Sequence, residues 1–137
     1  MANQYPQPFV SLGAHPLHST LTSFPIACFS LALLSDIAYW QTSNLLWLHF
    51  SEWLLFAGIT FGILALTARG IDYLVRRMRP PWLAVMAAVF VLLLAAINNF
   101  VHTADGWTAV VPYGLILSAA TVLMMIITAW LGVRRHV

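Results

Sequence analysis

The chain has 137 residues, of which 61% are hydrophobic and only 7% are charged. Because a soluble domain has roughly 25% charged residues, this composition excludes an ordinary soluble domain and indicates a protein surrounded by lipid. The net charge is only +2, so a nucleic acid is not an expected partner. The single cysteine, Cys28, excludes a disulfide framework and a cysteine-based metal cluster.

Four apolar segments of about 20 residues, the length needed to cross a bilayer, follow one another along the chain. They cover residues 24–41, 53–74, 82–101 and 110–132. The short stretches between them are polar or contain proline and glycine, as is typical of turns. We therefore predict an all-α integral membrane protein, a bundle of four transmembrane helices. Residues 1–23 are expected to form an interfacial segment, residues 24–133 the transmembrane domain and residues 134–137 a basic cytoplasmic tail.

The arginines predict the orientation of the bundle. Arg69, Arg76, Arg77 and Arg79 lie around the second connection, and Arg134 and Arg135 follow the last span. With four spans these two places lie on one side of the membrane, and clustered arginines favour the cytoplasmic side. Both termini are therefore expected in the cytoplasm, and the first and third connections on the outer side.

Mostly small residues recur at steps of three or four in the predicted helices, which is the pattern of helix–helix contacts in lipid. The positions are Cys28, Ala32 and Asp36 in the first helix, Gly58, Gly62 and Ala65 in the second, Ala84, Ala88 and Ala95 in the third, and Gly114, Ser118, Thr121, Met125, Thr128 and Gly132 in the fourth. We expect these stripes to face one another inside one bundle. The pattern leaves both a monomer and an oligomer open.

Asp36 lies well inside the first predicted span. A charged aspartate at the centre of a transmembrane helix costs about 2.5–3.5 kcal/mol on insertion scales. Asp36 is therefore expected to face the bundle and to be protonated or hydrogen-bonded, and Tyr39, Asn98 and Asn99 lie at a comparable depth. Two roles are open: a contact for a proton or a quinone headgroup, and an interhelical hydrogen bond that fixes the bundle.

His49 and His102 are predicted at the same membrane level, in the first and third connections. Two histidines on opposite sides of a bundle can supply the axial ligands of a haem b. Asn98, one turn before His102, could orient the second ring nitrogen of that histidine. The alternative is that both are ordinary interfacial histidines.

The stretch 13–20, GAHPLHST, places His15 and His18 just before the first span. Pro16 disfavours helical backbone at His15 and suits the first position of a helix. The two imidazoles would then lie about one turn apart, where they could contact a haem or a quinone, or bind a metal together with Asp72. The other interpretation is that the segment lies along the interface and that both histidines hydrogen-bond to helix ends.

Several short motifs occur in an order and spacing that one family shares. They are HPLH at 15–18, FPI at 24–26, Asp36 within the first span, Trp53-Leu54-Leu55 followed by Gly58, Gly70-Ile71-Asp72-Tyr73, LSA at 117–119 and WLG at 130–132. Over nearly its whole length the sequence resembles a bacterial membrane family catalogued as domain of unknown function 2231. The resemblance implies a four-helix protein of the bacterial inner membrane, associated in some members with respiratory or redox proteins. Family members often have a histidine after the tryptophan that opens the third helix, but here Trp82 is followed by Leu, Ala, Val and Met.

These features together favour a small inner-membrane accessory or anchor subunit of a redox or respiratory complex, with haem b or quinone as candidate cofactors. Such a subunit is not expected to be an enzyme on its own. Its partners would be the lipid bilayer and either a protein in a membrane complex or a second copy of the chain, with no nucleic acid. The alternatives are a purely structural or assembly subunit that binds only protein and lipid and, less favoured, a small transporter that uses Asp36.

Overall fold

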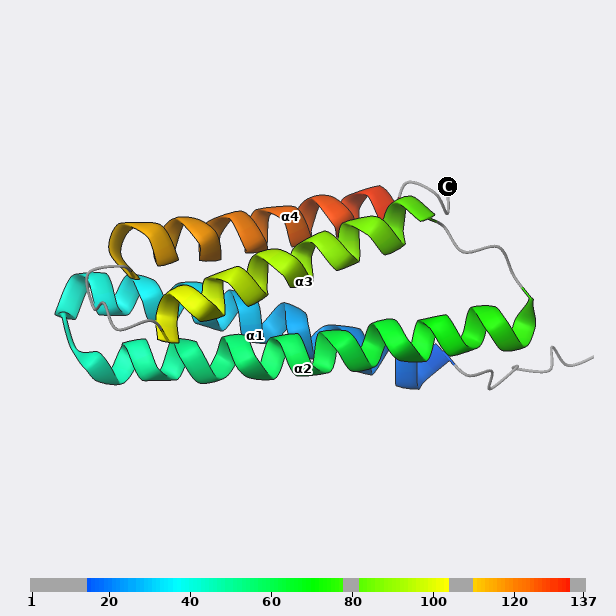
Figure 1. Ribbon diagram of the computed structural model, residues 1–137, viewed down its shortest axis with the longest axis horizontal. Coiled ribbons are helices and arrows are strands. Elements are labelled where there is room, and N and C mark those ends of the chain that lie inside the picture. Colours follow the sequence, from blue (N-terminus) through cyan, green and yellow to red (C-terminus); the bar gives the residue numbers. More distant parts are fainter. Residues whose placement is uncertain (1–14, 78–81, 104–109, 134–137) are drawn as a thin grey trace, which may run out of the picture.

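The computed structural model describes residues 15–77, 82–103 and 110–133, and side chains for 20–75, 77, 82–103 and 110–130. The elements are α1 (His15–Thr42), α2 (Leu45–Arg76), α3 (Trp82–Thr103), the wide turn η1 (Val110–Gly114) and α4 (Leu115–Val133). The helices run alternately in opposite directions, and α1 also contacts α4, so the four helices close into a ring (Figure 1). All four segments are long and apolar enough to cross a membrane, which confirms the predicted four-span bundle.

The first helix begins earlier than the sequence pattern indicated. α1 starts at His15, so the expectation that His15 is not helical is wrong. A proline disfavours helical backbone at the residue before it. In the first turn of a helix, however, the backbone N–H groups have no hydrogen-bond partner within the helix, so the missing N–H of Pro16 costs nothing. Polar residues such as Ser19 and Thr22 obscured this part of the helix.

The second helix also begins earlier than expected, at Leu45 instead of residue 53. Only Ser43, whose φ is 53°, and Asn44 separate it from α1. Asn44 is the N-cap, because its side-chain oxygen accepts a hydrogen bond from the backbone N–H of Leu46 at 3.0 Å. The predicted connection 42–52 is therefore too long: its later polar residues, His49, Ser51 and Glu52, belong to the first turns of α2.

The fourth candidate span begins at Val110, as predicted, but its first five residues form the turn η1, so the regular helix begins only at Leu115. Within the turn, Val111 has extended backbone angles (φ −120°, ψ 117°). This is the conformation favoured immediately before a proline, and Pro112 follows.

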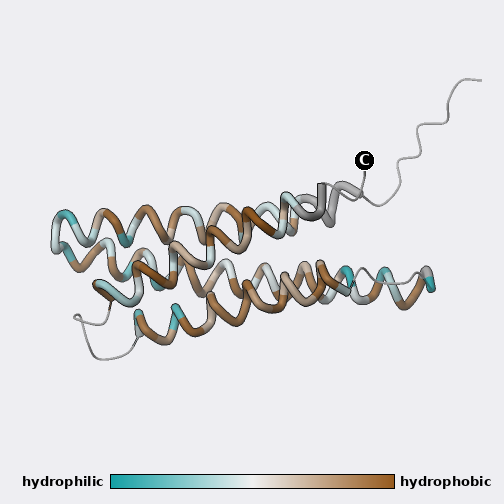
Figure 2. Tube along the Cα trace, turned by 90° about the horizontal axis from the view of Figure 1, so that it is seen from above, coloured by the Kyte–Doolittle hydropathy of each residue, from teal (hydrophilic) through white to brown (hydrophobic). Residues whose placement is uncertain are grey.

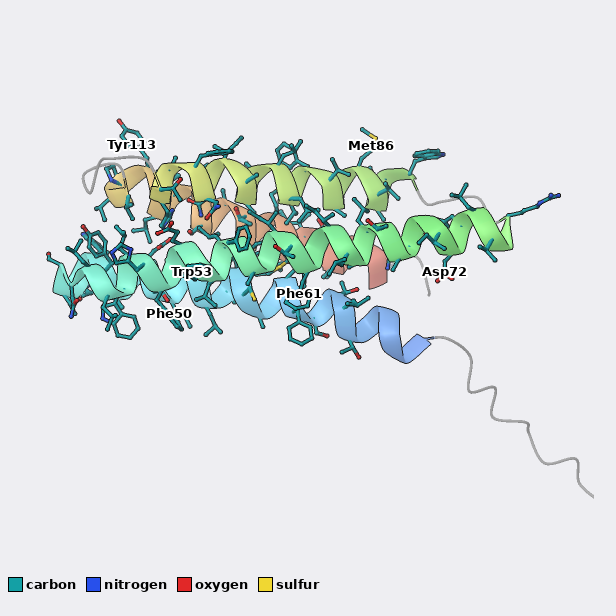
Figure 3. The ribbon with its side chains drawn as sticks, turned by 60° about the horizontal axis from the view of Figure 1, so that its bottom comes forward. Phe50, Trp53, Phe61, Asp72, Met86 and Tyr113 are labelled. Carbon is teal, nitrogen blue, oxygen red and sulfur yellow. The ribbon has the colours of Figure 1, made fainter. Side chains whose placement is uncertain are left out.

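The bundle is apolar outside and partly polar inside, the reverse of a soluble protein. Long hydrophobic stretches run along all four helices (Figure 2). Large apolar side chains point outward, among them Phe50, Trp53, Met86 and Tyr113, which are 51–69% exposed (Figure 3). Several of the most buried side chains are polar instead: Ser35, Asp36, Ser51, Asn98, His102, Ser118 and Thr121. An apolar exterior of this extent is suited to contact with lipid.

Most residues of the predicted small-residue stripes face the interior, whereas Cys28, Ala84, Ala88, Met125 and Thr128 are half-buried and Gly132 lies outside the residues whose side chains are described. Ala32, Asp36, Gly58, Gly62, Ala65, Ala95, Gly114, Ser118 and Thr121 are all buried. Halfway along the bundle, Phe29, Ala32, Leu55, Val91 and Ala95 pack into one apolar cluster, which we call the apolar layer. It divides the interior into two parts: polar side chains lie toward the α1–α2 turn, and a cavity lies toward the opposite end.

Two glycines of α2 differ in what a methyl group would meet, and this difference can be tested. A Cβ at Gly58 would lie 2.5 Å from Cε1 of Phe29, whose ring is fully buried in the apolar layer. We expect Gly58→Ala to lower the free energy of unfolding by about 1–3 kcal/mol, as overpacking does. A Cβ at Gly62 would meet only the end of the Leu92 side chain, which can move aside, so Gly62→Ala should cost less.

Gly70→Ala is the matched control, because nothing lies within 4 Å of the added methyl group. This change should leave stability unchanged or raise it by up to about 1 kcal/mol, the helix-propensity difference between the two residues. Unfolding in mixed detergent micelles, followed by circular dichroism, measures all three variants. If Gly58→Ala and Gly70→Ala lowered the free energy of unfolding equally, the close contact of Gly58 with Phe29 would not be the cause of the destabilisation.

Candidate functional site

Asp36 in α1 is completely buried, about 9 Å by helical rise from the end of the helix at Thr42. The hydroxyl of Ser51 in α2 donates to its Oδ1 at 2.6 Å, and the hydroxyl of Ser118 in α4 donates to its Oδ2. The Nε2 of His102 in α3 lies 2.8 Å from Oδ1. Each of the other three helices therefore places one side chain on this carboxyl group.

A second set of contacts holds these partners in place. Asn98 donates from Nδ2 to the hydroxyl of Ser118 at 2.7 Å, and its backbone oxygen lies 2.9 Å from Nδ1 of His102. The side chains of both Asn98 and His102 are buried. We call the five residues Asp36, Ser51, Asn98, His102 and Ser118 the polar cluster.

The hydrogen bonds of His102 determine how many protons the cluster holds. A backbone oxygen can only accept, so Nδ1 of His102 carries the proton in its contact with Asn98. Nε2 then either donates, as part of a charged imidazolium, or accepts a proton from a protonated Asp36. In both cases one proton lies between Nε2 and Oδ1, and the Asp36–His102 pair has no net charge.

This neutrality explains how two ionisable groups are accommodated inside a membrane bundle. An isolated charge in the hydrocarbon region is costly, whereas a pair that shares a proton and is hydrogen-bonded on both sides avoids most of that cost. The two serine hydroxyls supply the donors that water would otherwise provide to the carboxyl group.

Small residues let the helices approach closely around the cluster. Ala32 and Ala95, one turn from Asp36 and Asn98, are fully buried. A Cβ at Gly114 would lie 3.0 Å from Cε1 of His102, so the glycine leaves room for the imidazole ring beside the start of α4. Ser51 is close enough to α1 for its hydroxyl to lie 3.3 Å from the backbone oxygen of Ala32.

One buried polar atom of the cluster has no hydrogen-bond partner within the described part of the chain. It is Oδ1 of Asn98, and Oδ1 of the neighbouring Asn99 is in the same condition. A buried acceptor without a donor is unfavourable by about 1–3 kcal/mol. The cluster therefore has an unused acceptor next to its ionisable pair.

The expectation that Asp36 faces the bundle and is hydrogen-bonded is confirmed. Its partners differ from those inferred by depth, because Ser51, Ser118 and His102 make the contacts instead of Tyr39 or Asn99. Asn98 reaches the carboxyl group only through Ser118.

The structure brings His102 to Asp36 but does not bring His49 to His102. The side chain of His49 is 65% exposed and lies 3.6 Å from Glu52 on the same helix. His49 and the buried Ser51 are two residues apart in α2, so they point to nearly opposite sides of that helix. The side chains of His15 and His18 lie outside the described residues, and a haem, quinone or metal contact by them stays a prediction.

The sequence pattern contained a signal for the missed partner Ser51. The spacing of the α2 stripe continues backward from Gly58 through Leu55 to Ser51, at steps of three and four. In α3 the same alternation runs from Ala95 through Asn98 to His102. Extending each stripe to the end of its helix would have placed Ser51, Asn98 and His102 in the interior.

The fold and the polar cluster together define a class of protein: a small multi-pass membrane bundle with an ionisable pair in its interior. The family model described as "Predicted membrane protein (DUF2231)" matches residues 14–136. The chain belongs to this family, as its short motifs indicated. No curated protein and no solved structure matches the chain.

The two cluster serines can be separated experimentally from a buried serine that does not contact Asp36. We expect Ser51→Ala and Ser118→Ala each to lower the free energy of unfolding, because each removes a donor from a buried carboxyl group. The loss should lie between about 0.6 kcal/mol, the average for interhelical hydrogen bonds in membranes, and about 3 kcal/mol.

Ser35→Ala is the matched control, since this buried hydroxyl donates only to the backbone oxygen of Leu31 in its own helix. It should cost little, because such a bond back to the preceding turn adds little to helix stability. Detergent-micelle unfolding compares the three variants, and a loss at Ser35 as large as that at Ser51 would contradict the assignment.

Proposed function

We propose that this protein is a small accessory subunit of a redox complex in the bacterial inner membrane, and that its Asp36–His102 pair takes up and releases a proton inside the bundle. Both termini lie on the cytoplasmic side in this proposal. The observation that carries it is the 2.8 Å contact between Nε2 of His102 and Oδ1 of Asp36, with both side chains fully buried.

Proton exchange is the chemistry that the atoms of this pair can perform. Asp36 and His102 each have two protonation states, and intramembrane ionisable residues in contact with one another are typical of proton relays. Within the described residues no three His, Cys, Asp or Glu side chains come together as a metal site would require. Both ring nitrogens of His102 are already hydrogen-bonded, which gives ligation of a haem iron at this position less support.

The redox context rests on two arguments. Reduction and oxidation of a quinone exchange protons as well as electrons, so a proton-binding pair inside the bilayer suits a subunit beside a quinone-reactive complex. The resemblance described above also associates some family members with respiratory or redox proteins. The apolar outer faces of the helices are suited to contacts with lipid and with the helices of a partner.

A purely structural subunit is the main alternative, because the same hydrogen bonds would also fix the register of the four helices. The two proposals differ in one respect: a structural pair keeps its proton over the working pH range, and a functional pair does not. A transporter has less support, since the apolar layer separates the polar cluster from the other end of the bundle.

The proton step can be tested by pH-induced infrared difference spectroscopy of the full chain in lipid. Over roughly pH 4 to 10, where carboxyl groups and imidazoles titrate, we expect a carboxyl signal that Asp36→Asn removes and His102→Gln shifts. Asp72→Asn, which changes an exposed aspartate in the last turns of α2, should leave that signal in place. A spectrum unchanged by Asp36→Asn would overturn the proton step and favour the structural alternative.

The redox role can be tested in membranes of a strain that lacks this gene. We expect these membranes to oxidise quinol more slowly than wild-type membranes, and the wild-type chain to restore the rate. The Asp36→Asn chain, present in equal amount, should not restore it, because an amide cannot exchange a proton near neutral pH. Ser35→Ala should restore it fully, and a wild-type rate in the strain without the gene would exclude the redox role.

A further inference from the structure

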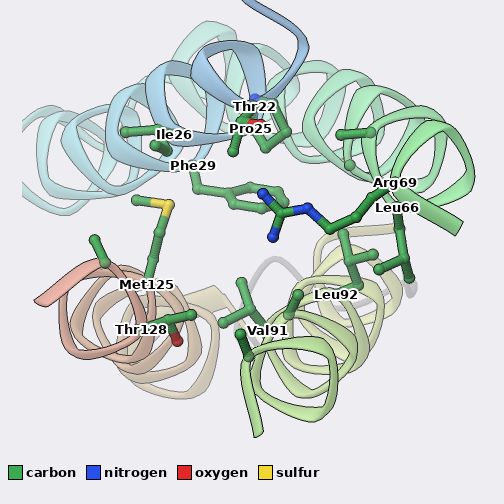
Figure 4. A pocket seen from close by; sticks show the side chains of 15 residues that line it. Thr22, Pro25, Ile26, Phe29, Leu66, Arg69, Val91, Leu92, Met125 and Thr128 are labelled. Carbon is green, nitrogen blue, oxygen red and sulfur yellow. The ribbon is translucent and has the colours of Figure 1, made fainter. Parts of the chain in front are cut away.

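A cavity of about 300 Å³ lies between the four helices, on the far side of the apolar layer from the polar cluster. All four helices contribute to its wall (Figure 4). Along α3 it extends from Ala84 to Leu92, a helical rise of about 12 Å. The cavity is thus an elongated space near the axis of the bundle.

Small side chains create this space. The residues that line it include Gly62, Ala65, Ala84, Ala88 and Ala129. Small residues in membrane helices usually allow the backbones to meet closely, but here the helices remain apart. Larger apolar side chains, among them Phe29 and Val91, form the inner end of the cavity.

One charged group is placed at the other end. Arg69 of α2 is half-buried and lines the cavity, and its side chain extends from α2 across the opening between the helices (Figure 4). Arg69 lies six residues before the end of the candidate membrane span Leu45–Val75, where a long basic side chain can reach the interface. Among the described residues that line the cavity, it is the only one with a charge, and Thr22 and Thr128 lie at the same end.

We propose that this cavity binds one fatty acid, with its carboxylate on Arg69 and its chain along the axis of the bundle toward Phe29. An apolar wall with a single cation at one end matches the two parts of such a molecule. The volume is at the low end of the roughly 300–1,000 Å³ typical of ligand pockets, which suits a single chain. A guanidinium binds a carboxylate through two parallel hydrogen bonds and so fixes the orientation of the chain.

This site does not depend on the proposed proton chemistry. The apolar layer lies between the cavity and Asp36, and the two sites share no residue. Asp36→Asn should therefore bind fatty acid as the wild type does, so failure of one proposal leaves the other intact.

The test is native mass spectrometry of the full chain in a neutral detergent, with dodecanoate as the probe. We expect one bound dodecanoate, and at least tenfold weaker binding of dodecanol, which lacks the charge. Arg69→Gln should weaken dodecanoate binding at least tenfold, whereas Arg69→Lys should keep most of it. Arg77→Gln, which changes the exposed arginine immediately after α2, is the control and should bind normally.

The volume of the cavity is tested separately by Ala88→Leu, which fills the space from α3. This variant should lose the adduct, while Ala119→Leu on the exposed side of α4 should retain it. Equal binding of dodecanoate and dodecanol, or retention by Ala88→Leu, would overturn the proposal. A stable adduct with phosphatidylglycerol that dodecanoate cannot displace would also overturn it, because the ligand would then be a lipid phosphate.

Discussion

The contact between Asp36 and His102 is the constraint on which the rest of the bundle depends. In lipid, no water is present to hydrogen-bond a buried ionisable group, so its lone pairs and protons require partners from the protein. Here Asp36 lies on α1 and its partners come from α2, α3 and α4. The depth at which Ser51, His102 and Ser118 must meet one carboxyl group therefore fixes how far each helix is displaced along the axis relative to the others.

The remaining interior is arranged around this fixed point in three successive parts. The polar cluster lies next to the α1–α2 turn, the apolar layer centred on Phe29 follows, and the cavity below Arg69 lies at the far end. Packing against lipid gives little preference between apolar helix faces, because lipid tails are as apolar as the side chains. Directional contacts in the cluster and the close approach of Gly58 to Phe29 therefore supply specificity that hydrophobicity alone does not.

Much of this architecture could be predicted from the sequence, because steps of three and four residues identify which side of a helix faces inward. In α3 that spacing links Ala88, Ala95 and His102 to one face, and all three do point into the bundle. The pairing of residues between helices could not be predicted, since it depends on the length of each connection. The predicted start of α2 is eight residues too late, which corresponds to about 12 Å along the helix axis. With that start, Ser51 falls in a connection outside the helix and not beside Asp36. The cavity could not be predicted either, because small residues such as those that line it usually indicate close contact between helices.

The position of the apolar layer has a consequence for the electrical behaviour of the membrane protein. The polar cluster lies near one surface, and among the described residues of the layer itself every side chain is a hydrocarbon. In the proton exchange proposed above, a proton that reaches Asp36 from that surface would cross only a fraction of the bilayer, and moving one full charge across the whole membrane is worth about 2.3 kcal/mol per 100 mV. The occupancy of the pair would consequently follow the acidity of one compartment and respond only weakly to the transmembrane voltage.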